Sequence, residues 1–348
     1  MKNKILIKTI ITFLSLSFVI FGQSGTDVSK VGTVAATFLE IGAGAAANGM
    51  GAAFVSRAND ASALYWNVAG AADLNQNELV AIHTNWIADI SFDYAGLVLP
   101  LGSFGSLGFS FTSLSMPDDI VRTVDQPEGT GEYFSAGDLA IGVSYARKLT
   151  DRFSVGFTAK YIQESIWHMS SSAFAIDVGT IFRTDLFGGM VIGASISNFG
   201  TSMKLSGIDT RTYESVAPAQ LGTTDQVPYV IDLDSWNLPL IFRLGVSTNA
   251  IKTDDFRWTV AVDALHPNDD YESLNLGTEF AYQESFFLRA GYQSLYLVDN
   301  AEAEGGLTFG IGVSSKVLFG SDMVKFDYAY RDFGRLNGVN FFSVDVKF

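Results

Sequence analysis

The feature that most constrains this chain is an alternation of apolar residues with small or polar ones, which recurs from residue 79 to the end. Its clearest examples are the segments 153–161, 256–264, 324–331 and 342–348. A period of two residues is typical of β-strands whose two faces meet different surroundings. We therefore predict an all-β chain with about fourteen strands.

Alternation alone also fits a soluble β-sandwich, so the connections between strands matter. Membrane-spanning barrels have short periplasmic turns and longer outer loops. The predicted connections alternate in this way. Short ones lie near 101–106, 148–152, 183–189, 249–255, 282–285 and 318–323, and long ones near 116–137, 164–172, 198–237, 266–273, 295–306 and 332–339. The last strand ends in Phe348, like the recognition signal of the barrel-assembly machinery. We predict a transmembrane antiparallel barrel over residues 78–348.

Composition supports this fold and excludes several functions. The chain has 28 Phe, 13 Tyr and 34 Gly, which favour strands over helices. It has no cysteine, which excludes disulfides and thiolate metal sites. A net charge of −15 argues against nucleic-acid binding, because phosphates are bound by clustered Lys and Arg.

The N-terminus has the pattern of a secretory signal. Lys2, Lys4 and Lys8 precede an apolar run over residues 10–21, and Gly22 and Ser24 follow. A basic start, a short apolar core and small residues are typical of a cleaved signal peptide. We predict a signal peptide over residues 1–24 and export to the outer membrane; a membrane anchor is the alternative.

Residues 25–77 differ from the rest because they are rich in Ala and Gly and lack regular alternation. We predict that they form a small hatch of short helices and turns in the barrel lumen; an extension against the periplasmic rim is the alternative. Inward charges are predicted to line the lumen and anchor the hatch. They are Lys160, Arg243, Asp263, Arg289, Lys325 and Asp327.

No constellation for catalysis, metal or a cofactor stands out. Gly42-Ala43-Gly44 lacks the third glycine of a dinucleotide fingerprint. The three histidines are scattered without the spacing of a metal face, and the paired aspartates fall in predicted turns. A calcium site around residues 268–272 is the one alternative. We therefore predict a protein that is not an enzyme, with no cofactor and no metal.

The hatch region carries a family resemblance. The relevant stretches are Gly32-Thr33, residues 38–42, residues 48–55 and residues 59–70, about forty residues in total. They resemble the PorV/PorQ family, a branch of the FadL-like outer-membrane transport proteins. Asn67, Ala69 and Gly70 fall on the Asn-Pro-Ala-Gly hatch motif of that family. Val68 replaces the proline, so we expect a less rigid turn.

The resemblance implies a fourteen-stranded barrel with an internal hatch and a role in type IX secretion. Members bind the C-terminal domains of secreted cargo or components of a surface attachment complex. Tyr213, Tyr229 and Trp236, in the long connection of residues 198–237, are the predicted partner-binding residues. The alternative is FadL-like transport of a hydrophobic small molecule, for which Phe54, Tyr65 and Trp66 would line the pocket. The sequence does not distinguish a PorV-like, a PorQ-like or another member.

Overall fold

The computed structural model describes residues 31–214, 227–296, 306–316, 320 and 323–348. The predicted signal peptide lies outside these residues. Residues 32–348 form one compact unit, which contains all the described strands.

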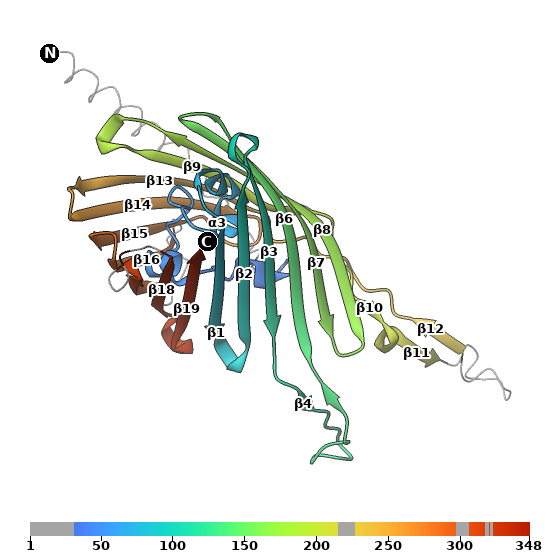
Figure 1. Cartoon of the computed structure of the whole chain (residues 1–348). Coiled ribbons are helices and arrows are strands. Elements are labelled where there is room, and N and C mark those ends of the chain that lie inside the picture. Colours follow the sequence, from blue (N-terminus) through green and yellow to red (C-terminus); the bar gives the residue numbers. More distant parts are fainter. Residues whose placement is uncertain (1–30, 215–226, 297–305, 317–319, 321–322) are drawn as a thin grey trace, which may run out of the picture. The chain divides into compact units, whose positions relative to one another are not determined.

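Fourteen antiparallel strands form one closed sheet, as predicted (Figure 1). Each strand pairs with the next strand of the wall along the chain, and β1 pairs with β19 from Glu78↔Lys347 to Asn85↔Asn340, which closes the barrel. The strands are β1 (Glu78–Asn85), β2 (Ser91–Pro100), β3 (Ser106–Ser115), β6 (Ala136–Thr150), β7 (Phe153–Ile166), β8 (Met169–Arg183), β9 (Val191–Gly200), β13 (Ile241–Lys252), β14 (Phe256–Pro267), β15 (Ser273–Tyr282), β16 (Phe286–Tyr296), β17 (Leu307–Ser314), β18 (Val324–Asp332) and β19 (Gly338–Lys347).

The two faces of the wall have opposite polarity. Along β18 and β19 the outward side chains of Phe326 and Phe342 are 59% and 45% exposed, whereas Asp327 and Ser343 point inward and are buried. A soluble β-sandwich has the reverse arrangement, with apolar residues inside. A broad apolar outer surface is stable only when a bilayer or a partner covers it. The soluble alternative is therefore excluded.

The connections are less regular than the sequence predicts. At one end of the barrel all described turns are short, as expected. At the other end, β7 ends only at Ile166 and β8 begins already at Met169. Residues 164–172 therefore form a tight turn and not a long loop. The polar residues Ser165 and Ser170 pair with each other there, because backbone hydrogen bonds extend a strand beyond its apolar part.

Two long hairpins project from this second end (Figure 1). The first contains β4 (Asp119–Ile120) and β5 (Tyr133–Phe134), and the second contains β11 (Arg211–Glu214) and β12 (Val227–Val230). At the base of the second hairpin, β10 (Ser206–Gly207) pairs with the outer end of β8. The second hairpin is thus partly paired strand, whereas the sequence predicts a loop over residues 198–237. Since longer loops mark the outer side of such barrels, this end faces the cell exterior.

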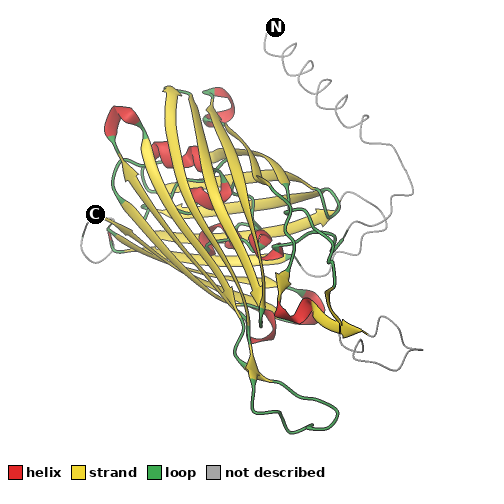
Figure 2. Cartoon of the chain, turned by 90° about the vertical axis from the view of Figure 1, so that its right-hand side faces the viewer, coloured by secondary structure: helices red, strands yellow, loops and turns green. Residues whose placement is uncertain are grey.

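Residues 32–77, here called the N-terminal segment, lie within the ring of strands (Figure 2). The helix α2 (Ala45–Gly49) contacts β16 to β19, whereas the 3₁₀ helix η2 (Val68–Asp73) contacts β3, β6, β7 and β8 on the opposite side. The segment also contains η1 (Thr37–Glu40) and α3 (Ala63–Trp66). It therefore occupies the lumen and bridges opposite walls.

The remaining 3₁₀ helices lie in connections: η3 (Ile87–Asp89), η4 (Gly102–Phe104), η5 (Leu186–Gly188), η6 (Ile208–Thr210) and η7 (Gly334–Leu336). Of the helices in the described ranges, none combines the length and apolar character that crossing a membrane requires.

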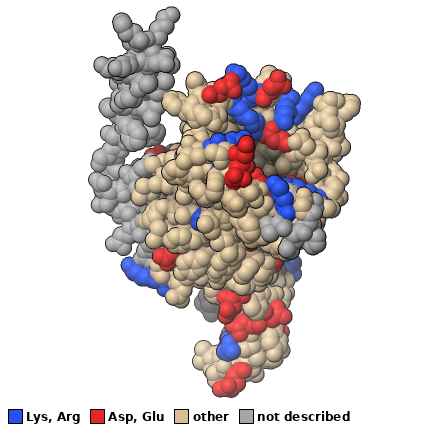
Figure 3. All heavy atoms as spheres, turned by 60° about the vertical axis from the view of Figure 1, so that its left-hand side comes forward, with Lys and Arg blue, Asp and Glu red and all other residues tan. Residues whose placement is uncertain are grey.

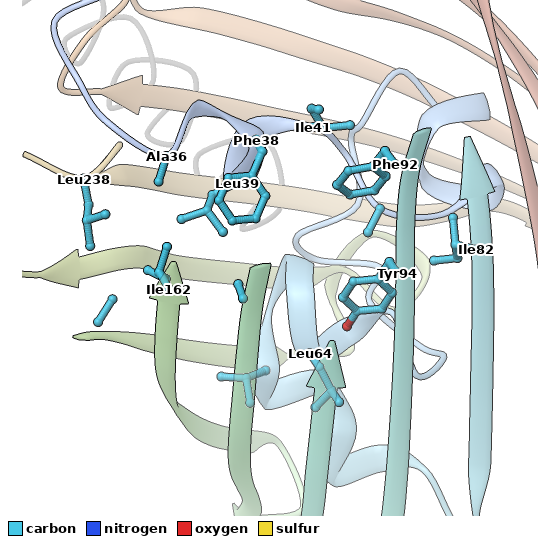
Figure 4. Packing of buried hydrophobic residues seen from close by; sticks show 14 of the residues in the cluster. Ala36, Phe38, Leu39, Ile41, Leu64, Ile82, Phe92, Tyr94, Ile162 and Leu238 are labelled. Atoms are coloured by element: carbon cyan, nitrogen blue, oxygen red, sulfur yellow. The ribbon is translucent and has the colours of Figure 1, made fainter. Parts of the chain in front are cut away.

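The largest buried apolar cluster lies between the N-terminal segment and the wall (Figure 4). Phe38 and Leu39 of η1 and Leu64 of α3 pack in it with Phe92 and Tyr94 of β2. Burial of such side chains stabilises by about 1.5–3 kcal/mol each. Glycines in the strands allow the N-terminal segment to lie still closer to the wall. A Cβ added to Gly179 would lie 2.2 Å from Asn67 Oδ1, and one added to Gly291 would lie 2.3 Å from the Gly51 nitrogen.

Gly179→Ala is expected to destabilise the folded barrel by about 1–3 kcal/mol, because overpacking forces the neighbouring residue out of place. The displaced residue is Asn67, so the N-terminal segment should also become more sensitive to protease in detergent. Gly137→Ala is the control, since its added Cβ meets one atom at 3.3 Å. Equal changes in unfolding temperature for the two variants would show that the close approach at Gly179 does not affect the stability of the barrel.

Candidate functional site

The predicted hatch motif, residues 67–70, lies against the wall at the beginning of η2. Asn67 is buried, and its Nδ2 donates to the carbonyls of Val55 (2.9 Å) and Thr180 (3.0 Å), while its Oδ1 accepts from the Ala69 nitrogen (3.2 Å). One side chain thus joins two parts of the segment to β8. Residue 70 has no room for a side chain, because a Cβ there would lie 2.1 Å from the Ala58 oxygen.

The three aromatic residues of the predicted ligand pocket are neighbours in the structure. The Trp66 ring packs edge-on against Tyr65 and Phe54, with centroids 5.0 and 6.3 Å apart, and its Nε1 donates to the Ala43 carbonyl at 2.7 Å. Phe54 borders one cavity and Tyr65 borders another. Their described contacts hold the segment together, and Arg243 lies over Trp66 at 5.8 Å.

A buried charge network joins the N-terminal segment to the wall. Glu279 on β15 is its centre: Arg57 of the N-terminal segment, Arg257 and Arg289 donate to its carboxylate at 2.8, 2.8 and 2.7 Å. Arg289 also reaches Asp327 at 2.6 Å, and Lys325 pairs with Asp327 at 2.8 Å. Sequence reasoning missed Glu279 and Arg57; the inward position of Glu279 in an alternating strand was the available signal.

The other predicted inward charges also have partners. Lys160 pairs with Asp177 at 2.9 Å, and the Asp263 carboxylate accepts from the Val55 nitrogen at 2.8 Å. Each of these contacts lies within the wall or joins the wall to the N-terminal segment. The N-terminal segment is therefore held to the wall by an ion pair and by hydrogen bonds at separate positions.

Glu40, in η1 near the outer mouth, is the most perturbed acid outside the strands. Burial, together with the carboxylates of Asp269 and Asp270, raises the pKa of Glu40 from 4.5 to about 7, while Arg243 opposes this shift. The folded chain therefore holds this proton more tightly than the unfolded chain does. The protonated Glu40 therefore contributes to the stability of the folded chain at low pH. This contribution is lost as pH rises from 4.5 to 7.

Glu40→Gln is expected to remove that loss. The variant should be more stable than the parent by about 1–2 kcal/mol near pH 8 and equally stable near pH 4, because Gln resembles the protonated acid. Thermal unfolding at the two pH values checks this. A difference of the same size at both values would contradict the assignment.

The predicted partner residues lie on the second projecting hairpin. Tyr213 and Tyr229 are exposed and point to opposite faces, because Tyr213 pairs with Pro228 and Thr212 pairs with Tyr229. Trp236 is exposed near its base and exchanges backbone hydrogen bonds with Met203. The predicted set is thus spread along one hairpin, part of which, residues 215–226, lies outside the described residues.

Charges at the outer end are mainly acidic. The first projecting hairpin carries Asp118, Asp119, Asp125, Glu128 and Glu132 with a single Arg122, and Figure 3 shows this acidic tip. Across the part of the chain that the structure describes, no three His, Asp or Glu side chains are grouped to hold a metal ion.

Comparison with solved structures shows which known proteins share this fold. The CymD monoaromatic hydrocarbon channel is 13% identical over 88% of this chain and 98% of its own, with a TM-score of 0.54. The Pseudomonas putida toluene transporter TodX is also 13% identical, over 88% and 97%, with a TM-score of 0.53. At such identity the likeness shows the fold, which is that of FadL-like outer-membrane barrels. No curated protein matches the chain.

These observations define the class: an outer-membrane barrel of FadL-like fold. The family model described as type IX secretion system protein PorV matches residues 24–238. The chain belongs to the PorV family, whose members are outer-membrane components of secretion. The family is thus described by a role in secretion, and the fold is that of a membrane barrel.

Proposed function

We propose that this protein binds secreted cargo or an attachment-complex partner at the cell surface, as an outer-membrane component of a type IX secretion machinery. The observation that carries the proposal is the second projecting hairpin, which extends paired strands and exposed aromatic residues beyond the barrel mouth. Tyr and Trp are common anchors of protein interfaces. Membership of the PorV family supports the same role.

The hairpin has properties expected of a binding element. A two-stranded ribbon is marginally stable alone in water and exposes unpaired backbone groups along its edges. Val230 and Ile231 beside Tyr213 and Tyr229 add exposed apolar surface. A partner strand or apolar surface would satisfy both needs.

The N-terminal segment serves, in this proposal, as the hatch that closes the lumen. Its support is a set of fixed contacts: Asn67 to β8, Arg57 to Glu279 and Val55 to Asp263. A lumen crossed by such contacts suits a protein that works at its outer surface. Transport of hydrophobic compounds, the activity named for TodX and CymD, has less support, because the likeness to those proteins shows the fold alone.

Purification of the intact protein from outer membranes of the producing cells tests the proposal. We expect secreted proteins that share one C-terminal domain, or a surface protease of the attachment complex, to be recovered with it. A bound hydrophobic compound without any protein partner would overturn the proposal and favour transport.

A further inference from the structure

The ribbon formed by β11 and β12 in the second projecting hairpin has cross-strand hydrogen bonds at alternate residue pairs. The Ile231 nitrogen donates to the Thr210 carbonyl at 2.8 Å, and the neighbouring pair is Arg211↔Val230. Hydrogen-bonded and non-hydrogen-bonded pairs alternate along antiparallel strands. Arg211↔Val230 is therefore a non-hydrogen-bonded pair. Its backbone N–H and C=O groups point outward, toward the two edges of the ribbon.

A proline makes these two edges unequal. The next pair with outward backbone groups is Tyr213↔Pro228. Pro228 has no N–H, so the edge of β12 lacks a donor at this position. The edge of β11 presents both the N–H and the C=O of Arg211 and of Tyr213. Because proline on an edge strand discourages pairing with a further strand, the edge of β11 is the better one for such pairing.

The edge of β11 that faces away from β12 is open. β12 is the only described strand that pairs with β11. β8 pairs with β10 (Ser206–Gly207), but it begins at Met169 and does not continue beside β11. Among the described residues, none exchanges a backbone hydrogen bond with the outward groups of Arg211 or Tyr213. The ribbon therefore has a vacant position for one more strand, beyond the barrel mouth (Figure 1).

Exposed apolar side chains accompany this edge. Tyr213 and Ile208 are 66% and 59% exposed. Trp167, in the turn between β7 and β8, is also exposed and stacks on His168, whose Nδ1 contacts Asp209 at 3.2 Å. Trp167 is thus close to the beginning of β11. A strand added to β11 would bury apolar surface as well as form backbone hydrogen bonds.

The charges of the two projecting hairpins indicate which kind of strand fits. The first hairpin is acidic at its tip (Figure 3). In the described part of the second hairpin, acidic residues also exceed basic ones: Asp209, Glu214, Asp232 and Asp234 against Lys204 and Arg211. Since the whole chain has a net charge of −15, a second copy of this chain would be repelled. Opposite charge favours a partner strand that carries Lys or Arg.

We propose that the protein partner binds by adding one extended strand to the free edge of β11. The strand would pair with the outward backbone groups of Arg211 and Tyr213, and it would carry apolar side chains and positive charge. This inference rests on the proposed function, because it specifies how the partner of the hairpin is held. It identifies the backbone of β11 as the binding element, in addition to the aromatic side chains.

Amide hydrogen exchange tests this geometry on the full-length barrel in lipid nanodiscs. The probe is the purified C-terminal domain shared by the secreted proteins of the producing cells. We expect the amides of Arg211 and Tyr213 to exchange about tenfold or more slowly in the complex, because strand pairing protects them. The Val230 amide, on the opposite edge, should keep its rate. Protection of Val230 instead, or a complex without protection of Arg211 and Tyr213, would overturn strand addition.

Two substitutions at residue 213 separate the backbone from the aromatic ring. Tyr213→Pro and Tyr213→Val both lack the phenol, but only the proline variant lacks the outward N–H. Proline at this position leaves the cross-strand hydrogen bonds of the ribbon intact, as Pro228 does. We expect Tyr213→Pro to bind the domain about tenfold more weakly than Tyr213→Val, the effect of one lost hydrogen bond.

Val230→Pro and Val230→Ala are the matched controls on the other edge, and their affinities should be equal. Equal affinities of Tyr213→Pro and Tyr213→Val, when the parent binds the domain, would overturn strand addition and leave the proposed function intact. If the parent recovers no protein partner and does not bind the domain, the proposed function fails, and strand addition fails with it.

Discussion

Glu279→Gln is expected to lower the free energy of unfolding by about 3–5 kcal/mol, the usual cost of breaking a buried ion pair. Glu279 is 4% exposed, and its carboxylate receives Arg57, Arg257 and Arg289. A neutral amide would leave three guanidinium groups facing one another without the central negative charge. Arg57 would also lose its ion pair with the wall, so the N-terminal segment should loosen with the barrel.

Denaturant unfolding in lipid vesicles measures this effect, and Glu284→Gln is the matched control. Glu284 pairs with the same Arg257 at 2.6 Å, but its side chain is 54% exposed. Exposed pairs contribute about 0–1 kcal/mol, so the control should lose little stability. Similar losses in the two variants would show that Glu279 is not the centre of the network.

Replacing residues 205–234 by an Asn-Gly turn is expected to reduce partner affinity about 100-fold and to leave the barrel folded. Removing Tyr213 and Tyr229 removes two aromatic anchors, and such anchors often contribute about 2 kcal/mol or more each. The fold should survive because β9 and β13 pair with each other between Val191↔Ser247 and Ser197↔Ile241, below the deleted part. Removal of residues 119–134, the first projecting hairpin, is the control for a general effect of shortening this end.

Alternation in the sequence, together with the rhythm of short and long connections and the terminal Phe348, was sufficient to predict the barrel and its strand number. This worked because lipid outside and charge inside impose opposite demands on successive residues, as Phe326 and Asp327 show. Loop lengths were harder to predict. Ser165 and Ser170 look like loop residues, yet they pair, because hydrogen bonding of a strand does not depend on apolar side chains.

The residues described at the site differ in how far the sequence points to them. Asn67 and Gly70 could be selected through the resemblance to a family motif, and their contacts with Val55 and Ala58 explain why these residue types are needed. The meeting of Arg57 with Glu279 could not be predicted, since 222 positions separate them and no local pattern links them. Likewise, no local pattern indicates that the rings of Tyr65 and Trp66 pack edge-on against each other.

Co-purification of the parent protein and the variant shortened at residues 205–234 tests the central claim most directly. The account predicts that secreted proteins sharing a C-terminal domain, or an attachment-complex protease, are recovered with the parent and with the control lacking residues 119–134. They should be lost with the shortened variant. Equal recovery with all three proteins, or recovery of a hydrophobic compound and no protein partner, would contradict binding at this hairpin.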